Sequence, residues 1–327
     1  MGRAGGARCR LALVVALGLA AGVGGWTRGP ASSPARVRYR DRVFATADVT
    51  KDLTYGSGLL DGSPVPMQLD LWEPHGDPAA ARPIMIWMHG QGIGAGKASP
   101  QDIDIVTRFV QHGFVVVSID YRYESVEPLD DIVVEPLAAA RWVRAHAVEH
   151  RIDTTRIVFA GASAGAIRAL HAGYDADIGA GAPPADERVD AVLSFSGKGD
   201  PDRFQPGEPP LFMANGELDT AVPYADAVAT CDGADAAGVP CDLHSYPNTD
   251  HLGMLTYVPE LEGLSTAWMY DVLDLVHAAQ DPPSQAPTTT TATTTTTSVA
   301  SPTTIAAPDP GRAPPATPID RPAHFSG

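Results

Sequence analysis

Two short segments and two later residues carry side chains that together could do covalent chemistry. They are His89-Gly90-Gln91-Gly92, Gly161-Ala162-Ser163-Ala164-Gly165, and a later acid and histidine at Asp219 and His251. A serine hydroxyl becomes a nucleophile when a histidine accepts its proton and an acid orients that histidine. The order nucleophile, acid, base is one of the chain orders in which such triads occur. The sequence therefore predicts acyl transfer by Ser163, Asp219 and His251.

Ser163 lies where a buried strand is expected to turn into a helix. Residues 156–160 are an apolar run typical of a strand, and residues 166–172 have helix-forming composition. The glycines beside the serine allow the strand and helix to approach closely on a sharp turn. A helix N-terminus also places N–H groups and partial positive charge beside the hydroxyl. The alternative is a structural Gly/Ser turn.

A glycine-rich loop after an earlier predicted strand could supply an oxyanion hole. Residues 82–88 have the composition of a buried strand that leads directly into His89-Gly90-Gln91-Gly92. A tetrahedral intermediate needs preorganised N–H donors that point at its developing oxyanion. The predicted donors are the backbone amides of Gln91, Gly92 and Ala164. An ordinary glycine turn is the alternative.

Several motifs together resemble a known enzyme family. They are LDLWEP at 69–74, WMHG at 87–90, VVSIDYR at 116–122, ARWVR at 140–144 and GASAG at 161–165. This set resembles the carboxylesterase and lipase branch of the α/β-hydrolase superfamily, which includes hormone-sensitive-lipase-like and feruloyl-esterase-like enzymes. The resemblance spans about residues 55–280 and implies the α/β-hydrolase fold and ester hydrolysis. Gln91 replaces a glycine usual in the family, so its side chain could narrow the acyl site or add a polar contact.

Two carboxylates compete for the role of the acid. Residues 209–215 are predicted to form a strand, and residues 216–223 (GELDTAVP) the loop that leaves it. This loop resembles the family's acid-bearing Gly-x-x-Asp-x-x-Val-Pro pattern, in which the acid follows the glycine by three residues. The resemblance therefore selects Asp219, and Glu217 is its nearest rival.

The base is expected after the next strand, predicted at residues 241–246. His251 lies in the polar, turn-rich loop that follows this strand, which is the expected place for a catalytic histidine. His244 lies within the predicted strand, where a lone histidine is more often structural. Four further histidines fall on predicted helices and are expected at the surface, namely His112, His146, His150 and His171.

Composition argues against several other classes of function. The sequence contains neither a Cys/His cluster with zinc spacing nor a glycine-rich string with the Walker lysine, so we expect no metal and no cofactor. Residues 43–280 carry 13 of the 23 basic side chains and 35 of the 39 acidic ones. An acidic body repels phosphate backbones, which disfavours nucleic acid and polyanionic substrates.

The N-terminal segment predicts export. Arg3, Arg8 and Arg10 precede an apolar run at residues 11–23, a pattern typical of a secretory signal. We expect a signal peptide over residues 1–31, with a cleavage site that the sequence does not fix, and a secreted or cell-surface protein. An uncleaved N-terminal membrane anchor is the alternative.

Cysteine usage agrees with export. Removal of the signal would take Cys9 with it and leave the pair Cys231 and Cys241. In an oxidising compartment this pair predicts a disulfide, and two buried thiols are the alternative.

The chain is expected to contain a catalytic domain at residues 32–280 and a disordered tail at residues 281–327. The tail begins with a run of Thr, Pro, Ala and Ser, which offers nothing to bury and so cannot offset the entropy of ordering. It could serve as an O-glycosylated stalk or a spacer. We see no C-terminal membrane or lipid-anchor signal.

Apolar runs alternate with helical patterns across the predicted catalytic domain. This alternation predicts a mostly parallel central sheet with helices on both faces. An antiparallel edge is expected from a strand pair at 37–45 and 52–55, and a last helix at 261–279. The sequence between residues 196 and 209 is too short for a large lid domain. The strands are predicted at residues 65–72, 83–88, 114–119, 157–160, 191–195, 211–214 and 243–246.

These observations support three functional hypotheses. The first is a secreted serine carboxylesterase that hydrolyses small-molecule or cell-surface esters. The second is a serine peptidase or acyltransferase on the same fold, because fold does not fix function. The third is a non-catalytic cell-surface binding module.

Overall fold

The computed structural model describes residues 36–60, 63–90, 97, 99–121, 132–174 and 185–278. The chain divides into two compact units, Met1–Ala35 and Arg36–Gly327. All described residues belong to the second unit. The predicted signal segment 1–31, the predicted tail 281–327 and the predicted donors Gln91 and Gly92 lie outside the described residues. Within the described part, no helix is both long and apolar enough to cross a membrane.

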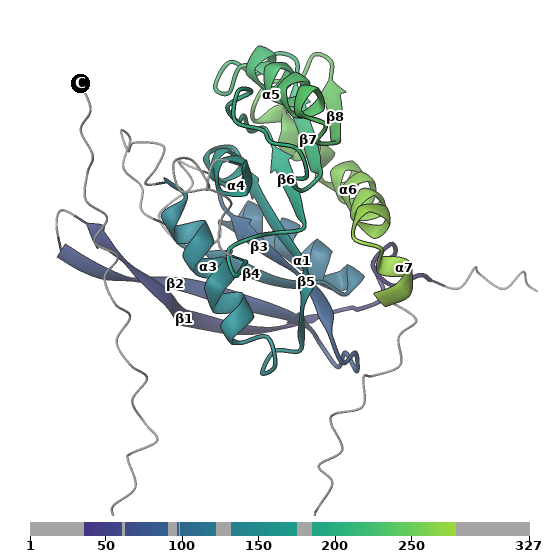
Figure 1. The fold of residues 1–327 in the computed structure, drawn as a ribbon. Coiled ribbons are helices and arrows are strands. Elements are labelled where there is room, and N and C mark those ends of the chain that lie inside the picture. The colour runs from purple at the N-terminus through teal and green to yellow at the C-terminus, as the bar shows by residue number, and fades with distance from the viewer. Residues whose placement is uncertain are drawn as a thin grey trace, which may run out of the picture. The chain divides into compact units, whose positions relative to one another are not determined.

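The described chain alternates strands and helices, as the apolar pattern predicted (Figure 1). The strands are β1 (Ala47–Leu60), β2 (Ser63–Pro74), β3 (Arg82–Met88), β4 (Val115–Ile119), β5 (Ile152–Ala162), β6 (Ala191–Phe195), β7 (Leu211–Gly216) and β8 (Cys241–Tyr246). The helices are α1 (Pro100–His112), α3 (Val134–Ala145), α4 (Ala164–Tyr174), α5 (Tyr224–Ala237), the 3-10 helix η1 (Gly253–Tyr257), α6 (Val258–Val272) and α7 (Leu275–Ala278).

All the strands join one sheet in the order β1-β2-β4-β3-β5-β6-β7-β8. Strands β4, β3, β5, β6, β7 and β8 pair in parallel, while β2 is antiparallel to both β1 and β4. The connection between β6 and β7 contains only turns and bends. The mostly parallel sheet with an antiparallel edge is confirmed.

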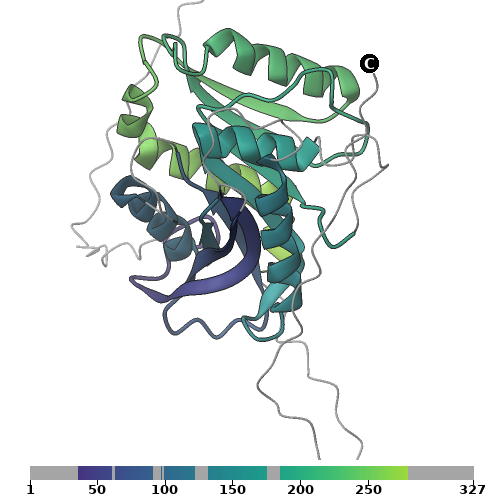
Figure 2. The same ribbon diagram turned by 90° about the vertical axis from the view of Figure 1, so that its left-hand side faces the viewer.

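The predicted edge pair at residues 37–45 and 52–55 is wrong. The antiparallel partners are β1 and β2, which form the long twisted ribbon seen in purple in Figure 2. Residues 52–55 lie inside β1, but residues 37–45 are turns fastened to the end of α1. Tyr39 N donates to His112 O at 2.8 Å, and Val43 N donates to Gln111 O at 2.8 Å. These backbone groups are satisfied by a helix end, so the segment needs no sheet partner.

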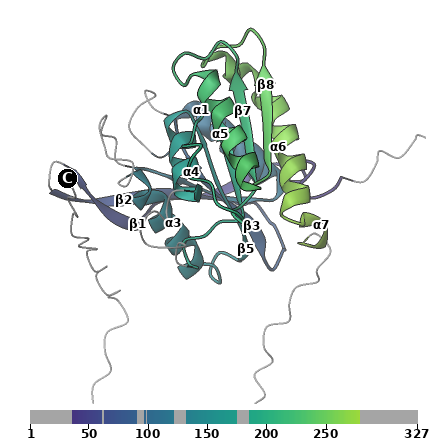
Figure 3. The ribbon, with the colours of Figure 1, turned by 45° about the horizontal axis from the view of Figure 1, so that its top comes forward.

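Helices cover both faces of the sheet, which is why most residues of its central strands are apolar. All residues of β3, β4, β6 and β7 are buried, as expected when both faces are covered. One apolar cluster joins the sheet to α3, α4 and α5, and a second joins it to α1 and α6. Figure 3 shows α5 and α6 on opposite sides of β7 and β8.

The last predicted helix, at 261–279, is observed as two helices. Helix α6 ends at Val272, and α7 begins at Leu275 after Asp274 adopts a φ of 49°. The Arg156 side chain donates to the carbonyl oxygen of Leu273 at 2.8 Å and to that of Asp274 at 3.3 Å. The break is therefore stabilised by a residue of β5, a contact that no local pattern indicates.

Two of the helical histidines are buried rather than exposed, which corrects the expectation of a surface location. His112 is 4% exposed and His171 is 5% exposed. His112 Nε2 lies 2.8 Å from Glu262 Oε1, so it belongs to a buried charge network.

Glu262 of α6 is the centre of this network. Its carboxylate accepts hydrogen bonds from the Arg42 guanidinium and from Arg108 Nη1, the latter at 3.0 Å. Burial alone would raise the pKa of Glu262, but the bonds from His112, Arg42 and Arg108 outweigh it and lower the pKa to about 2. The network ties the segment before β1 to α1 and α6.

Replacing Glu262 by Gln should lower the melting temperature in a pH-dependent way. At pH 7 we expect a loss of about 2 kcal/mol, roughly 4–8 °C, because the charged hydrogen bonds from Arg42, Arg108 and His112 to the buried carboxylate are weakened. A carboxyl with a lowered pKa in the folded state stabilises the fold above its ordinary pKa, and this contribution fades as pH falls toward the folded value. The difference from wild type should therefore shrink between about pH 4.5 and pH 3.

Calorimetry of wild type, Glu262→Gln and the exposed control Glu149→Gln from pH 7 to pH 3 checks this. A Glu262→Gln deficit that stays constant across the pH range would contradict the assignment.

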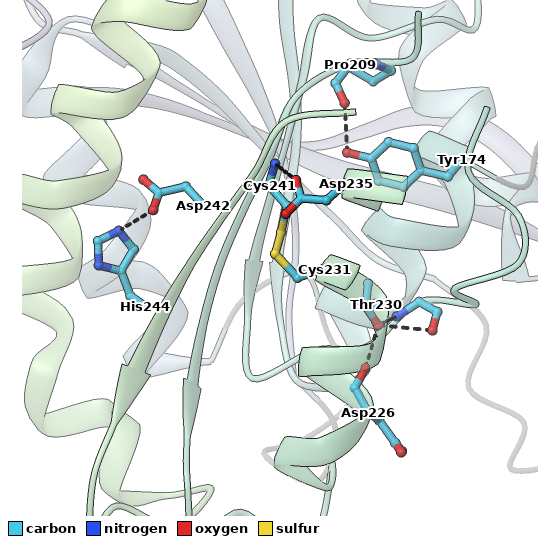
Figure 4. The surroundings of a disulfide bond; sticks show 10 residues. Tyr174, Pro209, Asp226, Thr230, Cys231, Asp235, Cys241, Asp242 and His244 are labelled. Carbon is cyan, nitrogen blue, oxygen red and sulfur yellow. Dashed lines mark hydrogen bonds and ion pairs between the residues drawn. A yellow bond between two sulfur atoms is a disulfide. The ribbon is translucent and has the colours of Figure 1, made fainter. Parts of the chain in front are cut away.

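The structure contains the disulfide that the sequence predicted. It joins Cys231 of α5 to Cys241, the first residue of β8, as Figure 4 shows. Asp235 Oδ1 also accepts a hydrogen bond from Cys241 N at 3.3 Å. Both contacts close the connection between α5 and β8, the strand that leads to His251.

Candidate active site

Ser163 occupies a strained turn between β5 and α4. Its φ is 53°, in the left-handed region that residues with a side chain rarely adopt. The turn is held from two sides, because Ser163 N donates to Phe195 O of β6 at 2.8 Å and Ser163 O accepts from Ile167 N at 3.0 Å. The predicted sharp strand-to-helix turn is therefore present, with the serine at its apex.

The two glycines around Ser163 lie in direct backbone contact with a neighbouring strand. A Cβ atom on Gly165 would lie 2.1 Å from Met88 O and 2.5 Å from His89 O. A Cβ atom on Gly161 would lie 2.5 Å from the carbonyl carbon of Gly165. No side chain fits at either position, so the end of β3 and the start of α4 can meet only because both residues are glycine.

The three residues predicted to form the triad are brought together. His251 Nε2 lies 2.8 Å from Ser163 Oγ, and His251 Nδ1 lies 2.6 Å from Asp219 Oδ2. An ionised carboxylate only accepts hydrogen bonds, so Nδ1 carries the imidazole proton and Nε2 accepts from the serine hydroxyl. The arrangement can move a proton from Ser163 to His251.

Asp219 is fixed by the loop that carries it. Its Oδ1 accepts from Ala221 N and Val222 N, each at 2.9 Å, which leaves Oδ2 for His251. The Asp219 side chain is fully buried. Its rival Glu217 is exposed, and the structure places Asp219 against the imidazole.

The acid loop and the base loop touch through their backbones. Leu218 N donates to Thr249 O at 2.9 Å. A Cβ atom on Gly216 would lie 2.3 Å from the same oxygen, so this position requires glycine. His244, the rejected candidate, lies in β8 and stacks on Phe212 with ring centroids 4.8 Å apart. Backbone contact between the loops therefore aligns Asp219 with His251.

One of the three predicted oxyanion donors lies in the described part of the chain. Ala164 is the first residue of α4, so its N–H is among the four at a helix start that lack a partner within the helix. Gln91 and Gly92 stay predictions. The residue before them, Gly90, does lie beside the nucleophile, because a Cβ atom built on it would be 3.6 Å from Ser163 Cβ.

A stack of side chains that the sequence reasoning missed supports the end of β3. Tyr121 donates its hydroxyl hydrogen to His89 O, and the two rings stack with centroids 4.4 Å apart. The Arg168 guanidinium lies over the Tyr121 ring, 4.2 Å from its centroid. His89 Nδ1 in turn donates to Gly90 O at 2.8 Å. The VVSIDYR motif contains Tyr121, but only the tertiary structure shows what it contacts.

The far end of the loop after β3 is also anchored. Lys97 Nζ forms ion pairs with Asp52 and, at 3.2 Å, with Asp70. Ser118 of β4 donates its hydroxyl hydrogen to Lys97 O. Both ends of the segment that holds Gln91 and Gly92 are thus fixed to the sheet.

Asp120, which follows β4, is a titratable group with a strongly shifted pKa. Burial raises the pKa of its carboxyl to about 6, although a hydrogen bond from Gln68 N and the charge of Lys97 act in the opposite direction. The Gln68 bond is 2.6 Å long. Asp120 therefore joins β2 to the end of β4, next to Tyr121.

Comparison with known proteins shows which enzymes this chain resembles. The BD-FAE family model matches residues 69–205. The chain is 27% identical over 262 residues to the esterase LipI of Mycobacterium tuberculosis, which covers 66% of this chain and 79% of LipI. It is 28% identical over 202 residues to the probable carboxylic ester hydrolase LipM of that organism, which covers 59% of this chain and 45% of LipM.

Solved structures show the same fold. Esterase 2 of Thermogutta terrifontis, phosphoramylated by tabun, matches with a TM-score of 0.58 at 22% identity, covering 72% of this chain and 98% of that one. Fold, family model and relatives define the class as an α/β-hydrolase. The chain is similar to the carboxylesterase and lipase branch of that superfamily, and these similarities support its assignment as a carboxylic ester hydrolase.

Asp219→Asn should be far more damaging than Glu217→Gln. Asparagine offers no negative charge to a protonated His251, and its amide can present N–H where the imidazole needs an acceptor, so kcat should fall about 10³- to 10⁴-fold. Glu217→Gln should stay within about threefold of wild type because its side chain is exposed. Steady-state kinetics on a small soluble ester, with melting temperatures for both variants, measures this. The reverse ranking would reassign the acid.

Proposed function

We propose that this protein is an exported serine carboxylesterase that works through an acyl-enzyme intermediate. The observation that carries the proposal is the continuous relay from Ser163 Oγ to His251 Nε2 at 2.8 Å and from His251 Nδ1 to Asp219 Oδ2 at 2.6 Å. The relay ends on a serine held at positive φ at the start of a helix. This combination of nucleophile, base and orienting acid is suited to acyl transfer.

Acylation would begin when Ser163 Oγ attacks the ester carbonyl carbon and its proton passes to His251 Nε2. The negative charge of Asp219 stabilises the imidazolium that results. The carbonyl oxygen becomes an oxyanion, for which Ala164 N–H and the predicted donors Gln91 and Gly92 would provide hydrogen bonds. When the tetrahedral intermediate collapses, the bond to the alcohol oxygen breaks and Nε2 returns the proton to that oxygen.

Deacylation would repeat these steps with water. His251 Nε2 takes a proton from the water as its oxygen attacks the acyl carbon, and the second tetrahedral intermediate forms. Its collapse breaks the bond to Ser163 Oγ, which regains the proton, and the carboxylic acid leaves. The His251 side chain is 19% exposed, so water can reach the base.

The relatives support esters as the substrates of this enzyme, rather than the peptides or acyl acceptors that a serine triad can also use. LipI is named an esterase and LipM a probable carboxylic ester hydrolase. A peptidase would cleave peptide anilides as well as esters, whereas an esterase would leave the anilides intact, and an acyltransferase would favour an added acceptor over water. A binding module would show no turnover that depends on Ser163. A panel of chromogenic esters, run beside peptide anilides, separates these alternatives.

Two substitutions of Ser163 test the mechanism and the strain together. Ser163→Ala and Ser163→Gly should each lower kcat on a chromogenic ester by about 10⁴-fold or more, because both remove the nucleophile. Glycine tolerates positive φ without penalty, so Ser163→Gly should be about 1–2 kcal/mol more stable than Ser163→Ala. Kinetics and thermal unfolding of the pair measure both effects.

Near-wild-type turnover by either folded variant would refute the covalent mechanism. Equal stability of the two variants would refute the claim that the turn is strained.

We propose export on the basis of the basic residues and apolar run within residues 1–31 and the Cys231–Cys241 disulfide. Disulfides persist in oxidising compartments, which agrees with an extracellular body. Residues 281–327 would then act as a disordered spacer that presents the enzyme to small-molecule or cell-surface esters.

Expression of the full chain in a secreting bacterial host tests export. We expect protein in the medium whose intact mass shows a new N-terminus within residues 20–32 and no free thiol. Full-length protein in the membrane fraction would indicate an uncleaved anchor, and full-length protein confined to the cytoplasm would contradict export.

A further inference from the structure

Four leucine and isoleucine side chains are exposed in the described part of the chain, and two of them lie in the loops that carry Asp219 and His251. Among the described residues, the other large hydrophobic side chains that are exposed are all valines. Single exposed apolar residues are ordinary on a protein surface, but a pair in the loops of a functional site indicates a binding role. The four residues and their exposed fractions are Ile103 (40%), Leu218 (57%), Leu252 (69%) and Leu255 (41%).

Two of these leucines flank the triad directly. Leu218 precedes Asp219, and Leu252 follows His251. The segments that carry them are in contact, because Leu218 N donates to Thr249 O at 2.9 Å. Both leucines therefore belong to the pair of loops that holds the base and its acid.

Neither leucine contributes much to folding in this position. Burial of a leucine side chain stabilises a fold, and most of that free energy is forgone when more than half of the side chain faces solvent. A bound apolar group could recover part of this free energy by covering the two side chains. The leucines thus offer a binding surface without a competing structural role.

The chemistry of the relay decides which part of an ester would meet them. His251 Nε2 gives the proton taken from Ser163 to the alcohol oxygen as the bond between that oxygen and the acyl carbon breaks, so this oxygen must come within hydrogen-bond distance of the imidazole. The alcohol part of the substrate then lies on the His251 side of the scissile bond. Residues adjacent to His251 are placed to contact the alcohol rather than the acyl chain.

The charges on these loops narrow the choice of alcohol. Glu217 and Asp250 are exposed carboxylates next to Leu218 and His251. Asp250 Oδ1 accepts from Gly253 N at 2.7 Å, so its charge is held in place. Negative charge beside the leaving group disfavours anionic alcohols, and the two exposed leucines favour apolar ones.

We infer that Leu218 and Leu252 are specificity-determining residues that bind an apolar leaving alcohol, so that the preferred substrates are carboxylic esters of neutral, apolar alcohols. This inference rests on the proposed esterase function. The inference assigns Leu218 and Leu252 to the leaving alcohol alone. It therefore differs from a general preference for hydrophobic esters.

Two homologous series of water-soluble esters test the inference. In the alcohol series the acyl group is acetyl and the alcohol runs from methanol to hexanol. In the acyl series the alcohol is ethanol and the acid runs from acetic to hexanoic. All acetate esters form the same acyl-enzyme, so kcat/KM along the alcohol series reports on acylation.

In the wild type, kcat/KM should rise about twofold per added CH₂ in the alcohol series. Full burial of a CH₂ is worth about 0.8 kcal/mol, or about fourfold, and a half-open surface provides about half of that free energy. Leu218→Ser and Leu252→Ser should each reduce this slope, and the double variant should flatten it. The acyl series should keep its wild-type slope in all three variants.

The matched controls are Leu255→Ser and Val148→Ser. Leu255 lies in η1, and Val148 is 95% exposed and distant in sequence from both triad loops. Both should keep the wild-type slope in both series. Melting temperatures report folding, and Leu218→Gln and Leu252→Gln replace any serine variant that unfolds, because glutamine retains a similar volume.

Three results would overturn the inference. They are a wild-type alcohol series with no slope, a change confined to the acyl series in the leucine variants, and a loss of activity only on micellar or vesicle-bound esters, which would make the leucines a lipid-docking surface. None of these requires Ser163→Ala to retain turnover, so failure here is distinguishable from failure of the proposed esterase function.

Discussion

The site depends on a backbone contact that only glycine permits. Gly165, at the start of α4, lies so close to Met88 O and His89 O that a Cβ atom would overlap both oxygens. This contact brings the end of β3 against the turn after β5, which holds Ser163 at a φ of 53°. Ser163 and the start of the predicted oxyanion loop are therefore placed together by one constraint. The strain at Ser163 is maintained by the surrounding sheet and helix rather than by the serine's own preference.

The base and acid reach this turn by a second backbone contact, between Gly216 and Thr249. Strands β7 and β8 pair in parallel, so the loops that leave them emerge at the same edge of the sheet as Ser163. Their close approach fixes Asp219 against His251, and the two Asp219 oxygens are divided between loop amides and the imidazole. Parallel pairing thus converts three distant sequence positions into one relay.

The local sequence pattern predicts the structure correctly where the residue types themselves require the observed conformation. The GASAG motif predicted a sharp turn because only glycines fit around it, and β6 has the predicted bounds. The resemblance to the family's acid-bearing pattern selected Asp219 over Glu217. The misses all arise from contacts between distant segments. Residues 37–45 are held by the end of α1 rather than by a strand, and His112 is buried because Glu262, 150 residues away, pairs with it. The stacking of Tyr121 on His89 likewise has no signature in the sequence.

The central claim is that Ser163, activated by His251, is the residue that becomes acylated. The most direct measurement is intact-protein mass spectrometry after treatment with a diethyl aryl phosphate, followed by peptide mapping. The relay predicts one diethylphosphoryl group per chain, located on Ser163, with labelling abolished in Ser163→Ala and slowed at least about 10³-fold in His251→Ala. Stoichiometric labelling of a different residue, or of Ser163 at an unchanged rate without His251, would contradict the account.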